Sequence, residues 1–170
     1  KVEGFDVEAG VAGIPTAFVA EYGTGGPVIA ILAEFDALPG INQTANPDRE
    51  ERDGMGAGHA CGHNLFAAGS TTAAIAIKDW LEETGTPGRI RLYGTPAEEG
   101  GSGKVYMVRA GLFDDVDIAL HWHAGTATRR LRARRWRTAR PSSASMVSPH
   151  MRPAHRRRAV RRSTGSKPST

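Results

Sequence analysis

The sequence predicts an α/β protein with three layers: a sheet with helices on both faces, built from residues 1–124, followed by a disordered basic tail over residues 125–170. Two observations predict this class. Between residues 14 and 122, segments typical of strands alternate with segments typical of helices, which favours parallel strands joined by helical crossovers. The residues able to do chemistry gather where strands end or helices begin, the edge at which open α/β sheets bind ligands.

The first half of the predicted domain contains two strands and the longest helix. Ile14–Tyr22 and Pro27–Phe35 are apolar runs of strand type on either side of the glycine-rich turn Gly23–Gly26, and we expect them to pair as a hairpin. Leu38–Gly58 is polar and lacks periodicity, which is typical of a surface loop. Asn64–Glu83 is rich in alanine and has apolar residues at helical spacing, which predicts a helix.

The second half supplies the remaining elements. The segment Gly85–Gly88, with two glycines and a proline, ends the long helix. After it we expect a strand over Arg89–Gly94, a helix over Gly103–Leu112 and a strand over Asp117–Trp122. Each of these strands is followed by polar residues.

Charge divides the chain into two regions at about residue 125. Residues 1–125 hold all 18 acidic residues and 8 of the 22 basic ones, whereas the remaining 14 basic residues lie in residues 126–170. The net charge of +4 therefore describes the tail and not the domain, and must be explained before a nucleic-acid partner is inferred from it.

Several classes of protein are excluded by the sequence. No apolar run approaches the roughly 18 residues that a membrane-spanning helix needs. The single cysteine, Cys61, excludes an internal disulfide and fits a reducing, cytoplasmic setting. The first ten residues contain neither an initiator Met nor a signal pattern, so we expect an N-terminal piece to be missing.

Four short motifs carry the residues that can do chemistry. They contain imidazole, thiolate and carboxylate groups, which together suit Zn²⁺, Mn²⁺ or Co²⁺. The motifs are AEFDALPG (33–40), GHACGHN (58–64), TPAEEGGSGK (95–104) and HWH (121–123), and their ligand-type residues are Asp36, Cys61, His63, Glu98, Glu99 and His123.

The adjacent carboxylates Glu98 and Glu99 indicate metal-assisted hydrolysis. In an extended loop, neighbouring side chains diverge, so one can hold a metal while the other faces a water molecule. A metal lowers the pKa of that water, and the carboxylate takes its proton and returns it to the leaving amine. The glycines at 100, 101 and 103 would let the backbone approach such a site closely.

Each candidate also has a plain structural explanation. Taken alone, Cys61 is more often a small buried residue than a ligand, and His121 is more easily explained as a partly buried strand residue. His59 can be part of the loop structure or an orienting partner of a ligand. The two adjacent glutamates could serve a helix macrodipole. Asp36 could cap a turn, although it fits better as an orienting partner.

Together the four motifs resemble those of the M20 family of metallopeptidases and amidohydrolases, and within it the branch of the aminobenzoyl-glutamate hydrolase B subunit. The similarity runs from about Gly4 to His123. It implies a zinc-peptidase-like catalytic domain with a divalent metal cofactor, Zn or Mn, as one or two ions. The implied substrate is a small-molecule amide of the N-acyl or aminobenzoyl amino acid type, cleaved to an amine and a carboxylate.

The resemblance also implies a role for each motif residue. Cys61 would bridge or bind metal, Asp36 would orient a ligand, and Glu98 would be the general base. The further metal ligands would be His63, Glu99 and His123.

Two parts of the family pattern are not visible in this sequence: a lid and dimerisation domain, and a distant histidine ligand. We therefore expect a truncated fragment that is poorly folded and weakly active or inactive. Full-length relatives would form homo- or hetero-oligomers through the lid domain.

The composition of the tail predicts a frameshift near His123. Residues 126–170 are rich in Arg, Ser, Pro and Ala, which is typical of high-GC DNA read out of frame. When each codon is rebuilt from the third base of one residue and the first two bases of the next, the tail can spell strings that resemble the family's continuation. Most letters are permitted and not forced, but Met146 and Val147 force a Gly that fits this continuation.

Two other functions stay open. A nucleic-acid-binding protein acting through residues 126–170 would bind in a steeply salt-dependent way, but this tail holds one aromatic residue, Trp136, and no stacking pattern. A thiol hydrolase using Cys61 with His63 or His59 would be insensitive to chelators, but it would leave the adjacent glutamates without a role. The leading prediction is therefore a metal-dependent amidohydrolase with no nucleic-acid or membrane partner.

Overall fold

The structure is a computed structural model that describes residues 3–125 apart from residues 53 and 55. All of these residues belong to one compact unit, Lys1–Thr128. The predictions of a disordered and frameshifted tail fall outside the described residues, apart from Gly125. The elements in chain order are β1 (Asp6–Ala9), the 3₁₀ helix η1 (Val11–Gly13), β2 (Phe18–Thr24), β3 (Val28–Glu34), β4 (Leu38–Pro39), β5 (Ala57–Gly58), α1 (His63–Thr84), β6 (Gly88–Thr95), α2 (Glu98–Gly101), α3 (Gly103–Arg109) and β7 (Ile118–Leu120).

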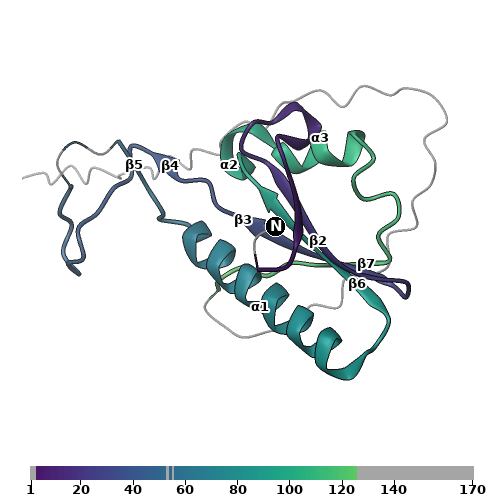
Figure 1. Ribbon diagram of the computed structural model, residues 1–170. Coiled ribbons are helices and arrows are strands. Elements are labelled where there is room, and N and C mark those ends of the chain that lie inside the picture. The colour runs from purple at the N-terminus through teal and green to yellow at the C-terminus, as the bar shows by residue number, and fades with distance from the viewer. Residues whose placement is uncertain (1–2, 53, 55, 126–170) are drawn as a thin grey trace, which may run out of the picture. The chain divides into compact units, whose positions relative to one another are not determined.

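The main sheet has five strands in the order β1-β2-β6-β3-β7 (Figure 1). The β6–β3 and β3–β7 pairs are parallel, whereas the β1–β2 and β2–β6 pairs are antiparallel. The helix α1 connects β3 to β6, and α2 and α3 lie in the connection from β6 to β7. The predicted α/β class with parallel crossovers is confirmed.

The predicted hairpin between the first two long strands is wrong, because β6 lies between them. Each of β2 and β3 pairs with one edge of β6 along its whole length. The glycine-rich turn is needed for a different reason. A Cβ at Gly23 would lie 2.1 Å from the carbonyl oxygen of Gly88, and one at Gly26 would lie 2.5 Å from that of Pro87. These glycines let the start of β6 pass beside the turn.

A hydrophobic cluster lies on each face of the sheet, in agreement with the three-layer prediction. Successive strand residues point to opposite faces, so Ile31 and Leu92 belong to the cluster that α1 covers. Ala30 and Tyr93 belong to the other cluster, to which η1 and α3 contribute. Figure 1 shows α1 on one side of the sheet and α2 and α3 on the other.

The predicted long helix is confirmed as α1, with one further residue at each end. It begins at His63 and ends where Gly85 takes a left-handed conformation, φ 63°, which glycine adopts without a steric penalty. The spacing of its buried residues Phe66, Ser70 and Ala74 is four, which gives one face against the sheet. None of the helices in the described part of the chain is both long enough and apolar enough to cross a membrane.

Several regions differ from the prediction. The strand predicted over Ile14–Tyr22 is β2, which begins four residues later, and the helix predicted over Gly103–Leu112 is α3, which ends three residues earlier. The strand β1 was not predicted: its sequence, DVEA, is a very short polar–apolar alternation, and all four side chains are exposed. The segment Leu38–Gly58 is irregular over most of its length, as predicted, but its ends pair as the two-stranded sheet β4–β5.

The parallel strands β3, β6 and β7 all end at the same edge of the sheet. Glu34 at the end of β3 pairs with Thr95 at the end of β6, and the last residue of β7, Leu120, pairs with Ile31. The four motifs continue from this edge, as the alternation of strands and helices predicted.

Candidate metal centre

His63 is the most deeply buried of the candidate ligands, with 1% of its side chain exposed. It is the first residue of α1, and its Nδ1 lies 3.0 Å from Oδ1 of Asp36. Its other nitrogen, Nε2, is buried and has no hydrogen-bond partner. The Asp36 contact places the proton on Nδ1, so Nε2 presents a lone pair, which is the state in which histidine binds a metal.

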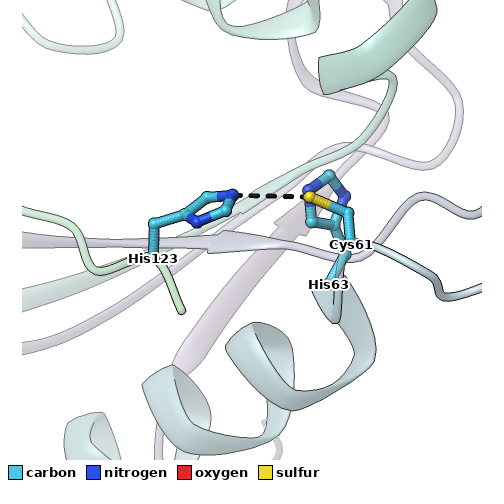
Figure 2. A group of neighbouring side chains, drawn as sticks. All are labelled: Cys61, His63 and His123. Carbon is cyan, nitrogen blue, oxygen red and sulfur yellow. Dashed lines mark hydrogen bonds between the residues drawn. The ribbon is translucent and has the colours of Figure 1, made fainter. Parts of the chain in front are cut away.

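Cys61 and His123 lie close to His63. The Sγ atom of Cys61 is 3.4 Å from Nε2 of His123, although the two residues are 62 positions apart (Figure 2). Each of Cys61, His63 and His123 offers a ligand atom, and these atoms lie within 4.8 Å of one another. Thiolate and imidazole in this arrangement are ligands of Zn²⁺ and related ions.

The two glutamates of the third motif lie in a short helical turn and not in the expected extended loop. Residues Glu98–Gly101 form α2, and the residues on either side, Ala97 and Ser102, take left-handed conformations with φ of 55° and 53°. Neighbouring side chains on a helix are about 100° apart, so the two carboxylates still diverge. Left-handed alanine and serine are strained, and such strain is common at functional sites.

The divergence gives the two carboxylates different neighbours. Oε1 of Glu99 lies 3.9 Å from Nε2 of His63. Glu98 belongs to a second group of possible ligand atoms within 4.8 Å, with Glu34 and His63. Glu99 therefore lies near the unpartnered nitrogen of His63, and Glu98 has an oxygen within 4.8 Å of a ring nitrogen of the same residue.

Asp36 joins this turn to His63. Its Oδ2 accepts a hydrogen bond from the backbone N–H of Glu99 at 3.1 Å, while Oδ1 contacts the His63 ring. Burial alone would raise the pKa of Asp36, but the backbone N–H groups of Glu99 and Glu98 and the ring of His63 outweigh burial and hold this pKa below its usual value. The orienting position predicted for Asp36 agrees with these contacts.

Of the predicted close backbone approaches, the one at Gly103 is clear. A Cβ there would lie 2.2 Å from the carbonyl oxygen of Pro96, and one at Gly101 would lie 3.0 Å from Cβ of Ala97. Gly100 has open space around it, so this part of the prediction does not apply to it.

Aromatic packing holds the HWH segment against α1. The ring centroids of Trp122 and Phe66 are 4.7 Å apart, and Nε1 of Trp122 donates a hydrogen bond to Oγ of Ser70 at 3.2 Å. Phe66 is fully buried, and its ring centroid also lies 5.4 Å from that of His63 and 4.9 Å from that of His123. One aromatic residue thus packs against two candidate ligands from different elements.

Three charged or titratable residues near the centre were not among the predicted ligands. Glu34 is only 3% exposed and contacts Lys104, His121 and His63. His121 is one third exposed, in line with its interpretation as a partly buried residue, and burial lowers its pKa. Two sequence signals for Glu34 were present: it lies in the motif AEFDALPG, and it is a single acidic residue at the end of an otherwise apolar strand.

His59 lies apart from the ligand groups. It is exposed and lines a surface cavity of about 390 Å³ with residues of the Leu38–Gly58 segment and the start of α1. It belongs to neither of the two ligand groups found among the described residues. Its backbone carbonyl accepts a hydrogen bond from Gly62 at 3.0 Å, which favours the interpretation as loop structure.

The residues present fit a divalent cation. The strongest sign is the buried Nε2 of His63, which lacks a hydrogen bond although buried polar atoms almost always have one. Burial, followed by the carboxylate of Glu99, raises the pKa of the Cys61 thiol, so an ion would have to displace its proton. A cation at this point would satisfy the nitrogen and offset the surrounding carboxylates.

Comparisons with known proteins find similar sequences and a similar solved structure. The model of peptidase family M20/M25/M40 matches residues 30–138. The B subunit of p-aminobenzoyl-glutamate hydrolase from Escherichia coli is 54% identical over 121 residues, which cover 71% of this chain and 25% of that protein. The A subunit from the same organism is 40% identical, over 65% of this chain and 27% of that protein.

A solved structure of an M20 peptidase is also similar to this chain. A dinuclear metal-binding peptidase of the M20 family from Bacillus subtilis matches with a TM-score of 0.59 and 31% identity, over 72% of this chain and 33% of that one. The chain spans about a quarter of the length of the curated relatives it matches. The family match covers well over half of the chain, and the chain therefore belongs to peptidase family M20/M25/M40.

Proposed function

We propose that the chain is part of a metal-dependent amidohydrolase that cleaves an amide of the N-acyl or aminobenzoyl amino acid type. The observation that carries this proposal is the buried, unpartnered Nε2 of His63, in a side chain whose neighbours include a thiol, an imidazole and two carboxylates. Family membership supports hydrolysis of an amide or peptide bond.

Cys61, His63, Glu99 and His123 would hold the metal, as one or two ions of Zn or Mn. When bound, such an ion lowers the pKa of water and polarises an amide carbonyl. Glu98 would accept a proton from the attacking water and return it to the nitrogen of the leaving amine. Its position supports this role, because one of its carboxylate oxygens lies within 4.8 Å of a ring nitrogen of His63 and its side chain diverges from that of Glu99.

Asp36 would keep His63 ready for the metal. By accepting a hydrogen bond from Nδ1–H, it fixes the tautomer that leaves Nε2 free. By accepting a hydrogen bond from the N–H of Glu99, it fixes the turn that carries both glutamates. His59 would at most support the loop before Cys61.

The relatives guide the proposal on substrate and partners. Because two of them are named as the B and A subunits of p-aminobenzoyl-glutamate hydrolase, we propose a small-molecule amide substrate and assembly with a related chain. A cytoplasmic location and the absence of a nucleic-acid partner stay predictions. We also keep the prediction that this chain alone is weakly active or inactive.

Metal binding by the purified chain tests the proposal. We expect the chain to retain Zn²⁺ or Mn²⁺ after desalting, measured by elemental analysis. The variants Cys61→Ser, His63→Ala and His123→Ala should lose the ion, while Glu98→Gln should keep it and abolish any turnover. His59→Asn is the matched control and should bind as the unmodified chain does. An unmodified chain without bound metal would contradict the proposal.

One contact favours a second candidate, a thiol hydrolase. Cys61 and His123 lie 3.4 Å apart, as a nucleophile and its base would. However, burial and nearby carboxylates raise the pKa of the Cys61 thiol, whereas a reactive cysteine needs a lowered pKa. Amide hydrolysis that survives a chelator but is lost with Cys61→Ser would support this candidate over the metal-dependent one.

A further inference from the structure

Glu34 is the most deeply buried carboxylate among the described residues, and the metal-dependent mechanism above does not use it. It ends β3 in the centre of the parallel part of the sheet, and 3% of its side chain is exposed. Burying a carboxylate to this degree is costly unless cations or hydrogen-bond donors surround it.

One oxygen of Glu34 has such partners. Nζ of Lys104, in the first turn of α3, donates a hydrogen bond to Oε1, and Nε2 of His121 lies 3.3 Å from the same oxygen. These partners come from the two segments that follow β6 and β7. They fix the carboxylate from two directions and leave its second oxygen free for another contact.

The second oxygen, Oε2, lies 3.4 Å from Nε2 of His63. Nδ1–H of His63 donates a hydrogen bond to Asp36, so Nε2 of the same ring carries no proton. Nε2 and Oε2 of Glu34 therefore face each other as two acceptors with no hydrogen bond between them. Two acceptors at this distance repel each other, and a cation beside both would remove the repulsion.

We propose that Glu34 supplies a further carboxylate to the metal centre: Lys104 and His121 hold one of its oxygens so that the other faces the ion bound by His63. This inference rests on the proposed metal-dependent function. It adds to the centre a carboxylate of the first motif that was not among the predicted ligands. The alternative is that Glu34 and Lys104 form a salt bridge that serves folding only.

A double variant separates the two explanations. Glu34→Gln together with Lys104→Met removes both charges, so no unpaired charge is left inside the protein. We expect this variant of the 170-residue chain to unfold near the temperature of the unmodified chain but to bind Zn²⁺ about 10- to 100-fold more weakly, the loss typical of contacts that orient metal ligands. Affinity would be measured by competition with a chromophoric chelator.

The matched control removes another lysine–glutamate pair. Lys78→Met with Glu82→Gln breaks the 3.5 Å pair on α1, which touches none of the candidate ligands, and should leave Zn²⁺ affinity unchanged. Equal affinity of the Glu34→Gln/Lys104→Met variant and the unmodified chain would overturn the inference while the metal site stands. Failure of the unmodified chain to bind Zn²⁺ would overturn the proposed function and the inference with it.

A second variant covers the case in which the double variant does not fold. Glu34→Asp keeps the charge but draws the carboxylate back by one methylene group. The visible absorption of bound Co²⁺ reports ligand geometry, and we expect Glu34→Asp to change this spectrum. An unchanged Co²⁺ spectrum would contradict the inference, because a carboxylate that serves folding alone has no effect on the ion.

Discussion

The candidate metal centre has a buried half and an exposed half, and different forces hold them in place. His63 is 1% exposed, lies at the start of α1 and has a carboxylate within 3.4 Å of each ring nitrogen. His123 is exposed and follows β7, which within the described residues pairs with β3 alone. Two carboxylates thus contact the first ligand, whereas the second contacts Cys61 and the backbone carbonyl of Ala124. The ring of Phe66 packs against both.

This difference predicts how substitutions in each half affect folding and metal affinity. Loss of a carboxylate near His63 should act on metal affinity more than on folding, since His63 is already enclosed by the sheet and α1. Loss of an aromatic contact near His123 should act on folding and metal affinity together, because the exposed segment has few other contacts.

The largest effect is expected where the two halves meet, at Phe66. Its buried ring packs against His63, His123 and Trp122. Phe66→Ala should lower the free energy of unfolding by about 3–5 kcal/mol, as other truncations of buried phenylalanines do. Urea denaturation followed by circular dichroism measures this, with Leu65→Ala, at a 62% exposed neighbouring position, as the control. A cost below about 1 kcal/mol would show that the two halves do not share this support.

The buried half is tested by Asp36→Asn. The amide keeps the shape of the side chain but lacks the negative charge of the carboxylate, whose two oxygens accept hydrogen bonds from His63 and from the N–H of Glu99. Zn²⁺ affinity should fall about 10- to 100-fold, which corresponds to roughly 1.4–2.7 kcal/mol. Titration against a chelator checks this, and Asp48→Asn, in the exposed segment before β5, should leave the affinity unchanged. Unaltered affinity in Asp36→Asn would mean that packing alone orients His63.

The exposed half is tested by Trp122→Phe. Phenylalanine keeps the ring against Phe66 but loses the Nε1 donor to Ser70. The expected cost is about 1 kcal/mol in the free energy of unfolding, together with a Zn²⁺ affinity that is lower by a factor of up to about ten. Trp80→Phe, on the exposed side of α1, is the matched control and should change neither quantity. If Trp122→Phe also changed neither, the hydrogen bond to Ser70 would have no part in holding His123.

The elements and the edge at which the site lies could be predicted from local patterns. Apolar runs and helical spacing are properties of neighbouring residues, so β3, α1 and β6 were placed to within one or two residues. The order of strands and helices then located the motifs at the carboxyl edge of the sheet. The resemblance to the M20 family supplied the roles, and the structure shows that the residues concerned meet there.

The remainder depends on contacts between distant segments, which local patterns do not contain. The hairpin prediction failed because β6, more than 60 residues after the turn, inserts between β2 and β3. Glu34 was overlooked because its partners, Lys104 and His121, come from segments about 70 and 90 residues further along the chain. Which half of the centre is buried follows from the position of β7 at the sheet edge, a property of the strand order alone.

The smallest effect is expected at an ion pair that touches none of the candidate ligands. Arg91 binds both carboxylate oxygens of Asp115, at 2.7 and 3.0 Å, and this contact holds the pKa of Asp115 below its usual value. A lowered pKa in the folded state stabilises the protein above the pKa of the unfolded state, and this stabilisation is lost as the pH falls through the folded-state value. Because Asp115 is 50% exposed, its contribution at neutral pH should be below about 1 kcal/mol.

Asp115→Asn therefore provides a comparison with the variants of the metal centre, because it lies outside the site. Its free energy of unfolding should be slightly lower than that of the unmodified chain at pH 7, and this difference should shrink as the pH falls below about 4. Urea denaturation at several pH values measures the difference, and Zn²⁺ affinity at pH 7 should be unchanged. A loss of affinity as large as that expected for Asp36→Asn would mean that charge anywhere on the sheet controls the centre. In that case, the division into a buried polar half and an exposed aromatic half would not describe how the ligands are held.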